Sequence, residues 1–306
     1  MSAPPRQRVE IVGAGLAGLL AANMLARHKP TIFERQPSLP NNHSAVLRCK
    51  SGIVGDILGI PFRKVTMVKA TSTWTNPVAD ALAYSFKSNG QYRSDRSIIQ
   101  QTVTAERFVA PPNLIGMMAD QLNGEIKFNT DYRFNNHNGN IVISTVPMPD
   151  LMRALQYSNM PEFYYQPGRN IHAQVKNCDA FVSLMIPHPD SDVTRISLTG
   201  AELIVECRGD STKSAELLVD IAANELGIKI AKITDITEYR TQYQKILPID
   251  DDQRKQFMHW ATDRFSIFSL GRFATWRPHL QLDDLVNDVR KIEGWFTDRY
   301  AMARSR

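Results

Sequence analysis

Three glycines near the start of the chain restrict its possible folds more than any other feature. Gly13, Gly15 and Gly18 follow a short β-rich run over residues 7–12 and open the apolar helical pattern LAGLLAANMLARH, after which TIFER is typical of a second strand. A strand, a glycine turn, a helix and a strand within about thirty residues form a βαβ unit. Such a unit requires a parallel sheet with a right-handed crossover.

Each glycine has its own task in a turn of this kind. Gly13 takes the tight turn, Gly15 lets the backbone approach a pyrophosphate, and Gly18 permits close packing of the helix. The helix N-terminus presents unpaired N–H groups and a positive dipole to the phosphates. Glu34, at the end of the second strand, would accept hydrogen bonds from the ribose hydroxyls of an adenosine half. The motif therefore predicts a dinucleotide and leaves NAD and FAD as alternatives.

The composition is that of an ordinary globular protein. Among 306 residues, 43% are hydrophobic and 22% are charged, which excludes a disordered or collagen-like chain. The formal net charge of +5 permits an anionic partner, such as nucleic acid or a nucleotide, without requiring one. The apolar stretch from Ile11 to Ala26 is too short and too rich in glycine to span a membrane, and the start lacks the features of a signal peptide. We therefore expect a cytoplasmic protein with no membrane partner.

The cysteines and histidines give no sign of a metal centre. Cys49, Cys178 and Cys207 lie far apart without a CxxC pair, and the seven histidines form no HxxxH or HExxH pair. We expect no metal, no disulfide framework and a reducing compartment.

The rest of the chain alternates between strand and helix patterns. From about 171 to 208 the runs IHAQV, FVSLMI, TRISLT and ELIVEC recur at the spacing of an antiparallel sheet. Between about 60 and 108, FRKVTMV and ALAYSF also alternate like strands. Helical patterns cover Leu114 to Leu122 and residues 213–227. These patterns predict a second layer beside the parallel sheet.

The segment from Ser269 to Asp284, SLGRFATWRPHLQLDD, carries the second strong signal. Gly271 and Arg272 end a strand, where the backbone can approach a phosphate and the guanidinium can pair with it. Asp283 is placed to cap the helix that follows, and the N-terminus of that helix would stabilise the negative charge of a reduced flavin. An ordinary strand, loop and capped helix remains an equal alternative for this segment alone.

Taken together, the glycine motif with Glu34 and Arg35, the strand NIVISTVP and the GRFATW…LDD segment resemble the flavin-binding pieces of the FAD-dependent amine oxidoreductase and UDP-galactopyranose mutase group. The resemblance implies that the cofactor is FAD. It implies cofactor contacts from Gly13, Gly15, Gly18, Glu34, Arg35, Arg48, Thr145, Gly271, Arg272, Trp276, Asp283 and Asp284.

This resemblance defines the expected fold class. We expect an α/β fold in which a Rossmann-like FAD-binding domain of the glutathione reductase type carries an inserted antiparallel β-sheet substrate domain. The expected FAD-binding domain is discontinuous and consists of residues 1–60, 100–150 and 262–306. Residues 61–99 and 151–261 form the expected substrate domain. Little length remains for a separate NAD(P)H domain, which favours a substrate that supplies the electrons itself.

The middle segments, including HSAVLRCKSGIVGDILGIPFRKV, are similar to a phage-borne family of small FAD enzymes linked to thymidine hypermodification. The resemblance implies oxidation at the C–N bond of an amino acid, such as glycine, that is attached to a modified thymidine in DNA. The products would be a keto or aldehyde acid and a 5-aminomethyl pyrimidine. The implied partner is modified DNA or a nucleotide.

A flavin accepts the hydride itself, so the protein needs only to orient the donor carbon and exclude water. His43 and Arg48 follow the second strand, where a base or carboxylate binder near the flavin would lie, and a solvated loop is the alternative. Lys64 and Lys69 flank a strand, and a lysine that binds a bridging water would suit amine oxidation, although surface solvation is the simpler interpretation. The candidate catalytic residues are thus His43, Arg48 and Lys64. The candidate substrate-binding residues are Tyr84, Arg93, Arg96, Arg195 and Arg240.

Three functions stay open at this point. The first is oxidation of an amine carried on a nucleotide or DNA base, with a generic amine oxidase as a variant. The second is a redox-neutral reaction of a nucleotide sugar, like that of the mutases. The third is a nucleic-acid-binding or scaffold protein that retains a cofactor only for stability.

Overall fold

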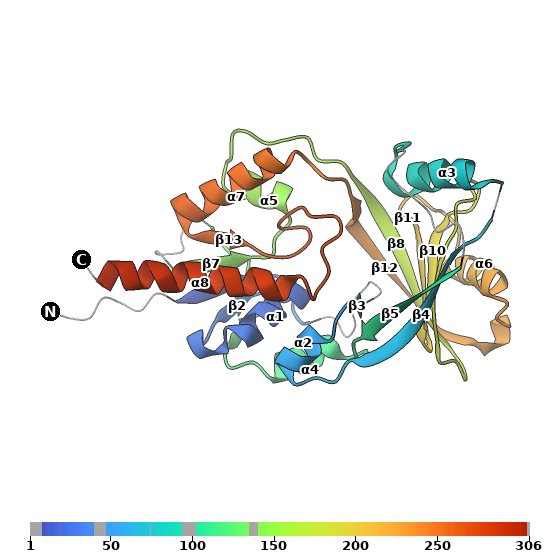
Figure 1. Cartoon of the computed structure of the whole chain (residues 1–306), viewed down its shortest axis with the longest axis horizontal. Helices are drawn as coiled ribbons and strands as arrows, with labels where there is room; N and C mark the ends of the chain where they lie inside the picture. Colours follow the sequence, from blue (N-terminus) through green and yellow to red (C-terminus); the bar gives the residue numbers. More distant parts are fainter. Residues whose placement is uncertain (1–7, 40–46, 74, 94–101, 135–139, 305–306) are drawn as a thin grey trace.

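The computed structural model describes residues 8–39, 47–73, 75–93, 102–134 and 140–304. In these residues the chain forms two sheets that follow one another along the long axis of the molecule (Figure 1). One is a parallel sheet that lies between layers of helices. The other is a larger, curled sheet that carries helices on its outside.

Five described strands form the parallel sheet, in the order β13-β7-β1-β2-β6. Their bounds are β1 (Val9–Val12), β2 (Thr31–Phe33), β6 (Glu125–Lys127), β7 (Ile141–Ser144) and β13 (Ile267–Ser269). All pairings in this sheet are parallel, and Ile11 lies in register with Ile32 on one side and Ile143 on the other. The βαβ unit predicted from the glycine motif is confirmed.

Helices cover both faces of the parallel sheet (Figure 1). One layer contains α1 (Leu16–Met24), α2 (Ile53–Leu58), α4 (Leu114–Asp120) and α8 (Leu285–Arg304), with the short η1 (Ala26–His28) after α1. The opposite layer contains α5 (Met148–Ala154) and α7 (Asp251–Phe265). Each layer shares an apolar core with its face of the sheet, which explains why the strands are apolar on both sides.

Eight described strands form the curled sheet, in the order β12-β8-β11-β10-β9-β4-β5-β3. Their bounds are β3 (Arg48–Cys49), β4 (Arg63–Thr71), β5 (Val103–Val109), β8 (Tyr165–Val175), β9 (Ala180–Met185), β10 (Val193–Gly200), β11 (Glu202–Arg208) and β12 (Ile233–Ile246). Neighbouring strands are antiparallel, as predicted for residues 171–208, except that β4 pairs with β9 in parallel. This parallel pair joins two segments that are distant in the sequence.

The two faces of the curled sheet differ in polarity. Helix α6 (Ala215–Leu226), with η2 (Ile230–Lys232) after it, packs on one face against a core that includes Ile171, Leu198 and Val205. We call the opposite side of the sheet the inner face. Because side chains alternate along a strand, the residues between these apolar positions point to the inner face, and they are mostly polar.

The segment ALAYSF lies inside helix α3 (Pro77–Asn89), so the prediction of a strand there was wrong. The Asn76 side chain accepts hydrogen bonds from the first turn of the helix, Pro77 occupies its first position, and Gly90 ends it with a φ of 74°. These start and stop signals are present in the sequence, but the polarity of the helix obscures them.

Helix α3 has its polar side inward. It buries Tyr84 and Ser88, among other polar residues, and exposes Val78, Leu82 and Phe86. An apolar stripe on the solvent side is the reverse of the usual amphipathic pattern. The helix lies at one end of the curled sheet (Figure 1), and its polar side forms part of the interior there.

Several elements lie in a different layer from the one that the predicted domain boundaries imply. Strands β3 and β5 come from segments predicted for the FAD-binding domain, 1–60 and 100–150, but they pair in the curled sheet. Helices α5 and α7 come mainly from the predicted substrate segment 151–261, but they pack on the parallel sheet. The chain therefore crosses between the layers more often than the boundaries suggest. The boundaries themselves stay a prediction.

Candidate cofactor and substrate site

The glycine turn connects β1 to α1 with no room for a side chain at Gly13. Gly13 has a φ of 98°, and a Cβ atom there would lie 2.2 Å from Thr145 Oγ1. Thr145 follows β7 and is held in place because its hydroxyl donates to the Val12 carbonyl at 2.7 Å. The ends of β1 and β7 thus meet at this turn, and Thr145 lies beside the glycines.

The other two glycines differ in their surroundings. A Cβ atom on Gly18 would lie 2.0 Å from the carbonyl oxygen of Gly13, so the helix packs directly on the turn. At Gly15 a Cβ atom would meet nothing within 4 Å. Gly15 is also the N-cap of α1, whose first N–H groups have no partner within the helix. The turn is closed toward the protein and open on the side of the helix N-terminus.

The Glu34 carboxylate lies against this turn. Its Oε2 accepts from the Ala14 N–H at 2.8 Å and its Oε1 accepts from the Gln36 N–H at 2.9 Å. The half-buried side chain is therefore fixed beside the glycines, where the motif predicts the adenosine ribose. Arg35, the next residue, is exposed.

The segment after β13 brings Gly271 to the same region. Gly271 has a φ of 104°, and a Cβ atom there would lie 3.2 Å from the Ala17 side chain of α1. Arg272 comes next and is half-buried, with its guanidinium 5.5 Å from the centre of the Phe273 ring. Two segments from opposite ends of the chain therefore meet beside the N-terminus of α1, as the resemblance implies.

Trp276 is a core residue. Its side chain is 1% exposed, its Nε1 donates to the Leu247 carbonyl at 2.9 Å, and its ring packs edge-on against Phe163 and Tyr243. Tyr243 belongs to β12, so Trp276 joins the parallel layer to the curled sheet. The aromatic cluster surrounds the Trp276 ring, so this packing gives no support to a cofactor contact by the ring, and the predicted contact stays a prediction.

Asp283 has a different role from the predicted helix cap. Its Oδ2 accepts from the backbone N–H groups of Lys50 and Ser51, at 2.9 and 3.1 Å, and so ties the start of α8 to the loop after β3. Its Oδ1 is buried and has no hydrogen-bond partner in the described part of the chain. Asp284 accepts from the Gln281 N–H at 2.9 Å.

Arg48 lies in the curled sheet. Its guanidinium donates to the carbonyl oxygens of Val182 and Leu198, at 2.9 and 2.6 Å, and to Thr199 Oγ1. Burial, together with the charge of Arg195, lowers the pKa of Arg48 to about 10. Arg48 thus contributes positive charge to the inner face, and its predicted role as a direct FAD contact finds no support in these bonds.

Of the two lysines on β4, Lys69 faces the inner side and Lys64 does not. Lys64 forms an exposed ion pair with Glu106 at 2.7 Å, so the catalytic role predicted for it is not supported. Lys69, five positions along the strand, points to the opposite face. Burial lowers the pKa of Lys69, and the charges of Arg107, Arg48 and Arg195 lower it further.

A buried ion network crosses the inner face nearby. Glu206, with its side chain 4% exposed, lies between Arg195 and Lys245, and its Oε2 is 2.9 Å from Lys245 Nζ. These two cations hold the pKa of Glu206 at about 2 despite its burial, whereas burial lowers the pKa of Lys245 to about 8. Arg272 also lowers the pKa of Lys245, which places the network next to the predicted cofactor segment.

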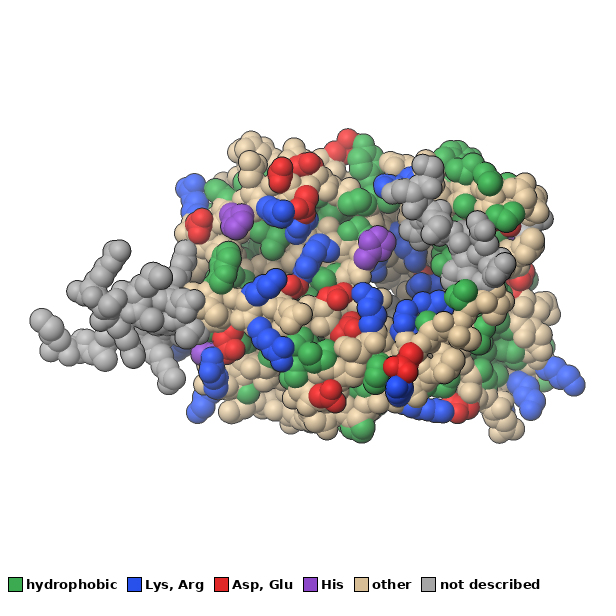
Figure 2. All heavy atoms as spheres, viewed as in Figure 1, with side chains coloured by type: hydrophobic (Ala, Val, Ile, Leu, Met, Phe, Trp, Pro, Cys, Tyr) green, Lys and Arg blue, Asp and Glu red, His purple; other side chains and the backbone are tan. Residues whose placement is uncertain are grey.

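Figure 2 shows Lys and Arg side chains gathered around a hollow between the two halves of the molecule. Arg107 and Lys245 belong to the inner face and were not in the predicted site. Lys69, which the sequence offered beside Lys64, also belongs to the inner face but was not among the predicted catalytic residues. Only the alternation of residues along strands could have indicated them, and it does not identify which strands are neighbours.

The remaining predicted substrate residues are scattered. Arg240 lies on the face opposite Arg195, is 63% exposed and pairs with Glu238, so the two arginines do not form one site. Tyr84 is 2% exposed in α3 and interacts electrostatically with Arg195. Arg93 follows α3 and is half-buried. His43 and Arg96 lie outside the described residues.

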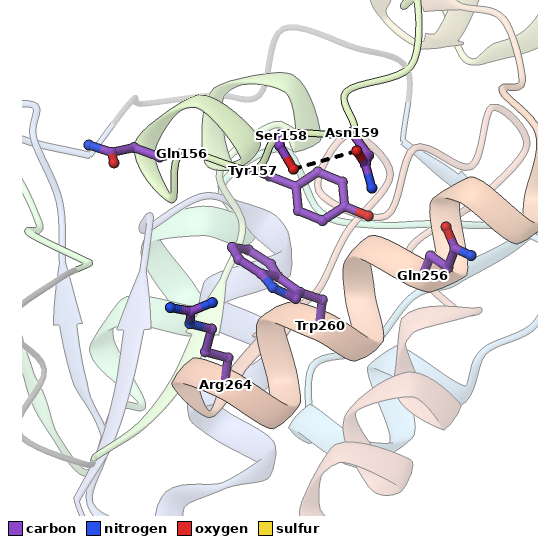
Figure 3. Close-up of a pocket in the computed structure, with 7 residues that line it drawn as sticks. All are labelled: Gln156, Tyr157, Ser158, Asn159, Gln256, Trp260 and Arg264. Carbon is purple, nitrogen blue, oxygen red and sulfur yellow. Dashed lines mark hydrogen bonds between the residues drawn. The ribbon is translucent and has the colours of Figure 1, made fainter.

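Two cavities lie away from the predicted site. A cavity of about 430 Å³ opens between the end of α5 and α7, and Figure 3 shows Tyr157, Trp260 and Arg264 around it. A second cavity of about 220 Å³ lies between α7 and α8 and includes Phe268 and Trp295 in its lining. No residue of the predicted site lines either of these two cavities.

Two negative findings apply to the described residues. No group of three or more His, Cys, Asp or Glu side chains among them could hold a metal ion. No helix in the same residues is long and apolar enough to cross a membrane.

The parallel sheet with its glycine turn, joined to a curled and largely antiparallel sheet, defines the class: a Rossmann-type fold of the kind seen in FAD-binding flavoproteins. Many solved structures share this fold, and they include the following three. Reduced UDP-galactopyranose mutase is 14% identical, with a TM-score of 0.65 over 96% of this chain and 94% of that chain. Glycine oxidase from Geobacillus kaustophilus is 14% identical, with a TM-score of 0.53 over 94% and 95%.

The third structure is pqsL, described as a probable FAD-dependent monooxygenase from Pseudomonas aeruginosa. It is 12% identical, with a TM-score of 0.53 over 96% of this chain and 87% of that chain. At such low identities the similarity establishes the fold alone. No family model matches the chain, and no curated protein matches it.

Proposed function

We propose that the chain binds FAD at the glycine turn and is an FAD-dependent oxidoreductase. The observation that carries the proposal is the contrast within the turn: Gly13 and Gly18 have no room for a side chain, whereas Gly15 faces open space at the N-terminus of α1. A pyrophosphate needs this combination of a closed turn and an exposed backbone. The fold shared with pqsL supports FAD over NAD.

The surrounding residues fit FAD. The backbone at Gly15 would hold the pyrophosphate, Glu34 would accept from the ribose hydroxyls, and Arg272 would approach from the other side of the turn. The buried Oδ1 of Asp283, which has no partner among the described residues, would accept from a hydroxyl of the cofactor. When bound, FAD supplies a two-electron acceptor for a hydride from the substrate.

The finer proposal concerns the substrate, an amino acid such as glycine attached through its nitrogen to a modified thymidine in phage DNA. Oxidation of the C–H bond beside the nitrogen, for which bound FAD would supply the two-electron acceptor, would give a substrate imine. Water adds to the imine, the C–N bond breaks, and a 5-aminomethyl pyrimidine and a keto or aldehyde acid are released. The two electrons then pass to an external acceptor. The resemblance of the middle segments supports this substrate, and the fold shared with glycine oxidase is consistent with it.

Mass spectrometry of nucleosides tests the substrate directly. Phage DNA that carries amino-acid-modified thymidine is incubated with the purified protein, digested and analysed. We expect the amino-acid-bearing nucleoside to decrease and the aminomethyl nucleoside to increase in equal amount. The Gly15→Ala variant, incubated in parallel, should convert much less. An unchanged nucleoside profile with a flavin-loaded protein would exclude this substrate.

A redox-neutral reaction of a nucleotide sugar is the second candidate. The TM-score of 0.65 to the mutase, compared with 0.53 to the oxidase, favours it. The two candidates predict opposite responses to reduction. The flavin absorbance of an amine oxidase is bleached when the amine substrate is added without air. A mutase-like enzyme instead converts a nucleotide sugar only after its flavin has been reduced with dithionite.

A further inference from the structure

Three cations lie together on the inner face. Arg48, Lys69 and Arg107 come from β3, β4 and β5, and within the described part of the chain none of them forms an ion pair with a carboxylate. Other inner-face cations are compensated: Arg195 and Lys245 share Glu206. We refer to Arg48, Lys69 and Arg107 as the cation cluster.

The strand register brings this cluster together. Lys69 lies opposite Ser183 of β9, which lies opposite Ser197 of β10, so the three share one row across the inner face. Arg48 donates to the carbonyls of Val182 and Leu198, which are the neighbours of that row. Arg107 lies on the adjacent strand β5 with the same facing as Lys69.

The row also contains an unsatisfied hydroxyl. Ser197 is 1% exposed, and its Oγ has no hydrogen-bond partner in the described residues. A buried hydroxyl without a partner costs free energy, and a ligand or a water would remove that cost. The inner face therefore contains a buried polar atom for which the described residues provide no hydrogen-bond partner.

Holding three partly buried cations together also costs free energy. Their mutual repulsion and their burial both disfavour the charged forms, and accordingly the pKa of Arg48 is lowered to about 10 and that of Lys69 is lowered as well. Perturbed groups that lie together beside a hollow are typical of functional sites. An anion bound among them would reverse the unfavourable electrostatics.

We propose that the cation cluster binds a phosphoryl group of the substrate. This inference rests on the proposed function, because it identifies that substrate as a nucleotide. Lys69 has no hydrogen-bond or ion-pair partner in the described residues, so its ammonium is available to a ligand. The Arg48 guanidinium already donates to Val182, Leu198 and Thr199, so it contributes charge rather than contact.

A phosphoryl group suits the cluster better than a carboxylate. It carries a charge of about −1.5 to −2 as a monoester and presents three acceptor oxygens, so it can engage several cations at once. A phosphodiester in DNA presents the same oxygens with about one negative charge. The chemistry is shared by a free nucleotide and by DNA, and the ligands chosen for the test separate the two.

Calorimetry on the flavin-loaded protein tests the proposal with thymidine 5′-monophosphate, thymidine and a short oligothymidylate. We expect the monophosphate or the oligonucleotide to bind about tenfold more tightly than thymidine. Lys69→Met should remove that difference. Lys64→Met, on the opposite face of the same strand, should retain it. A preference for the oligonucleotide indicates DNA, and a preference for the monophosphate indicates a free nucleotide.

Thermal unfolding without ligand gives an independent readout. Lys69→Met relieves repulsion within the cation cluster and should raise the melting temperature, whereas Lys64→Met removes only the exposed pair with Glu106. Equal binding of thymidine, its monophosphate and the oligonucleotide by the wild type overturns the inference. Unchanged binding by Lys69→Met, or a lower melting temperature of that variant, also overturns it. These experiments measure ligand binding and thermal stability and do not depend on turnover. A failure of the amine-oxidation assay can therefore be distinguished from a failure of this inference.

Discussion

At the residue scale, Gly15 and Gly18 have opposite reasons to be glycine. A methyl group on Gly18 would collide with the Gly13 carbonyl, whereas the same group on Gly15 would enter open space. Gly18 therefore serves the packing of α1, and Gly15 serves the approach of a ligand. The motif treats the two positions alike, but substitution should distinguish them.

We predict that Gly15→Ala weakens FAD binding about tenfold or more while it changes the free energy of unfolding of the apoprotein by less than about 1 kcal/mol. Gly18→Ala should destabilise the apoprotein itself. Flavin fluorescence titration and urea unfolding measure the two effects. Gly116→Ala is the control, because a Cβ atom at Gly116 in α4 meets nothing within 4 Å. Unchanged FAD affinity in Gly15→Ala would exclude the turn as the pyrophosphate site.

Glu206 provides a second prediction for a single residue. Replacing it with Gln leaves the buried Arg195 and Lys245 without their counter-charge, which should lower the free energy of unfolding by about 3 kcal/mol near neutral pH. Urea unfolding measures this loss. Asp210→Asn removes a surface pair with Arg208 and should have a much smaller effect.

The Glu206 carboxylate should also make the stability of the protein depend on pH. The folded pKa of Glu206, about 2, lies below its ordinary value of 4.5, so its contribution to stability is complete above pH 4.5 and is lost as the pH falls toward 2. The wild type should therefore lose stability faster than Glu206→Gln over this interval. Parallel slopes for the two proteins would mean that Glu206 is not held in its ionised form by the network.

At the scale of elements, helix ends follow local signals. Asp250 caps α7, and its side chain accepts from the Gln253 N–H at 2.9 Å. An acidic run, Asp250 to Asp252, spans the start of this helix, and the structure identifies Asp250 as the capping residue. Asp251 and Asp252 lie within the first turn of the helix.

We predict that Asp250→Ala lowers the free energy of unfolding by about 1 kcal/mol, because the N–H group of Gln253 loses its acceptor. Asp252→Ala should cost only a few tenths of a kcal/mol, since it removes only an interaction with the helix dipole. Chemical denaturation of the two variants compares them directly. Equal losses would show that charge alone, without the hydrogen bond, stabilises the start of α7.

Helix α3 has an amphipathic pattern of reversed polarity, which makes it hard to predict from the sequence. Its cap residues, Asn76, Pro77 and Gly90, are those of a regular helix, but its buried side is polar and its exposed side is apolar. A pattern search that expects apolar residues inside therefore favours a strand. The polar interior beside α3 explains the reversal, because the helix completes a polar surface.

At the scale of the whole molecule, cofactor binding should couple to stability. FAD at a concentration of one hundred times its dissociation constant should raise the free energy of unfolding by about 2.7 kcal/mol. Differential scanning fluorimetry across a series of FAD concentrations measures this effect. NAD at the same concentrations is the control, and an equal shift with NAD would contradict the assignment of FAD.

Binding to DNA also belongs to this scale. If phosphates of a DNA substrate contact the inner face, affinity should fall linearly with salt on logarithmic axes, with a slope that reflects the number of phosphates contacted. Lys69→Met should reduce that slope by about one contact. An affinity that does not vary with salt would exclude a polymeric substrate.

The βαβ unit, the glycine turn with Glu34 and the antiparallel run over residues 171–208 are predictable from the sequence, because the periodicity and spacing behind each are local. The sequence does not show that Arg48, Lys69 and Arg107 share one face, that Trp276 is buried in the core or that Asp283 binds the loop after β3. Each of these depends on strand pairing or packing between segments distant along the chain. A single sequence records which side chains alternate but not which strands become neighbours.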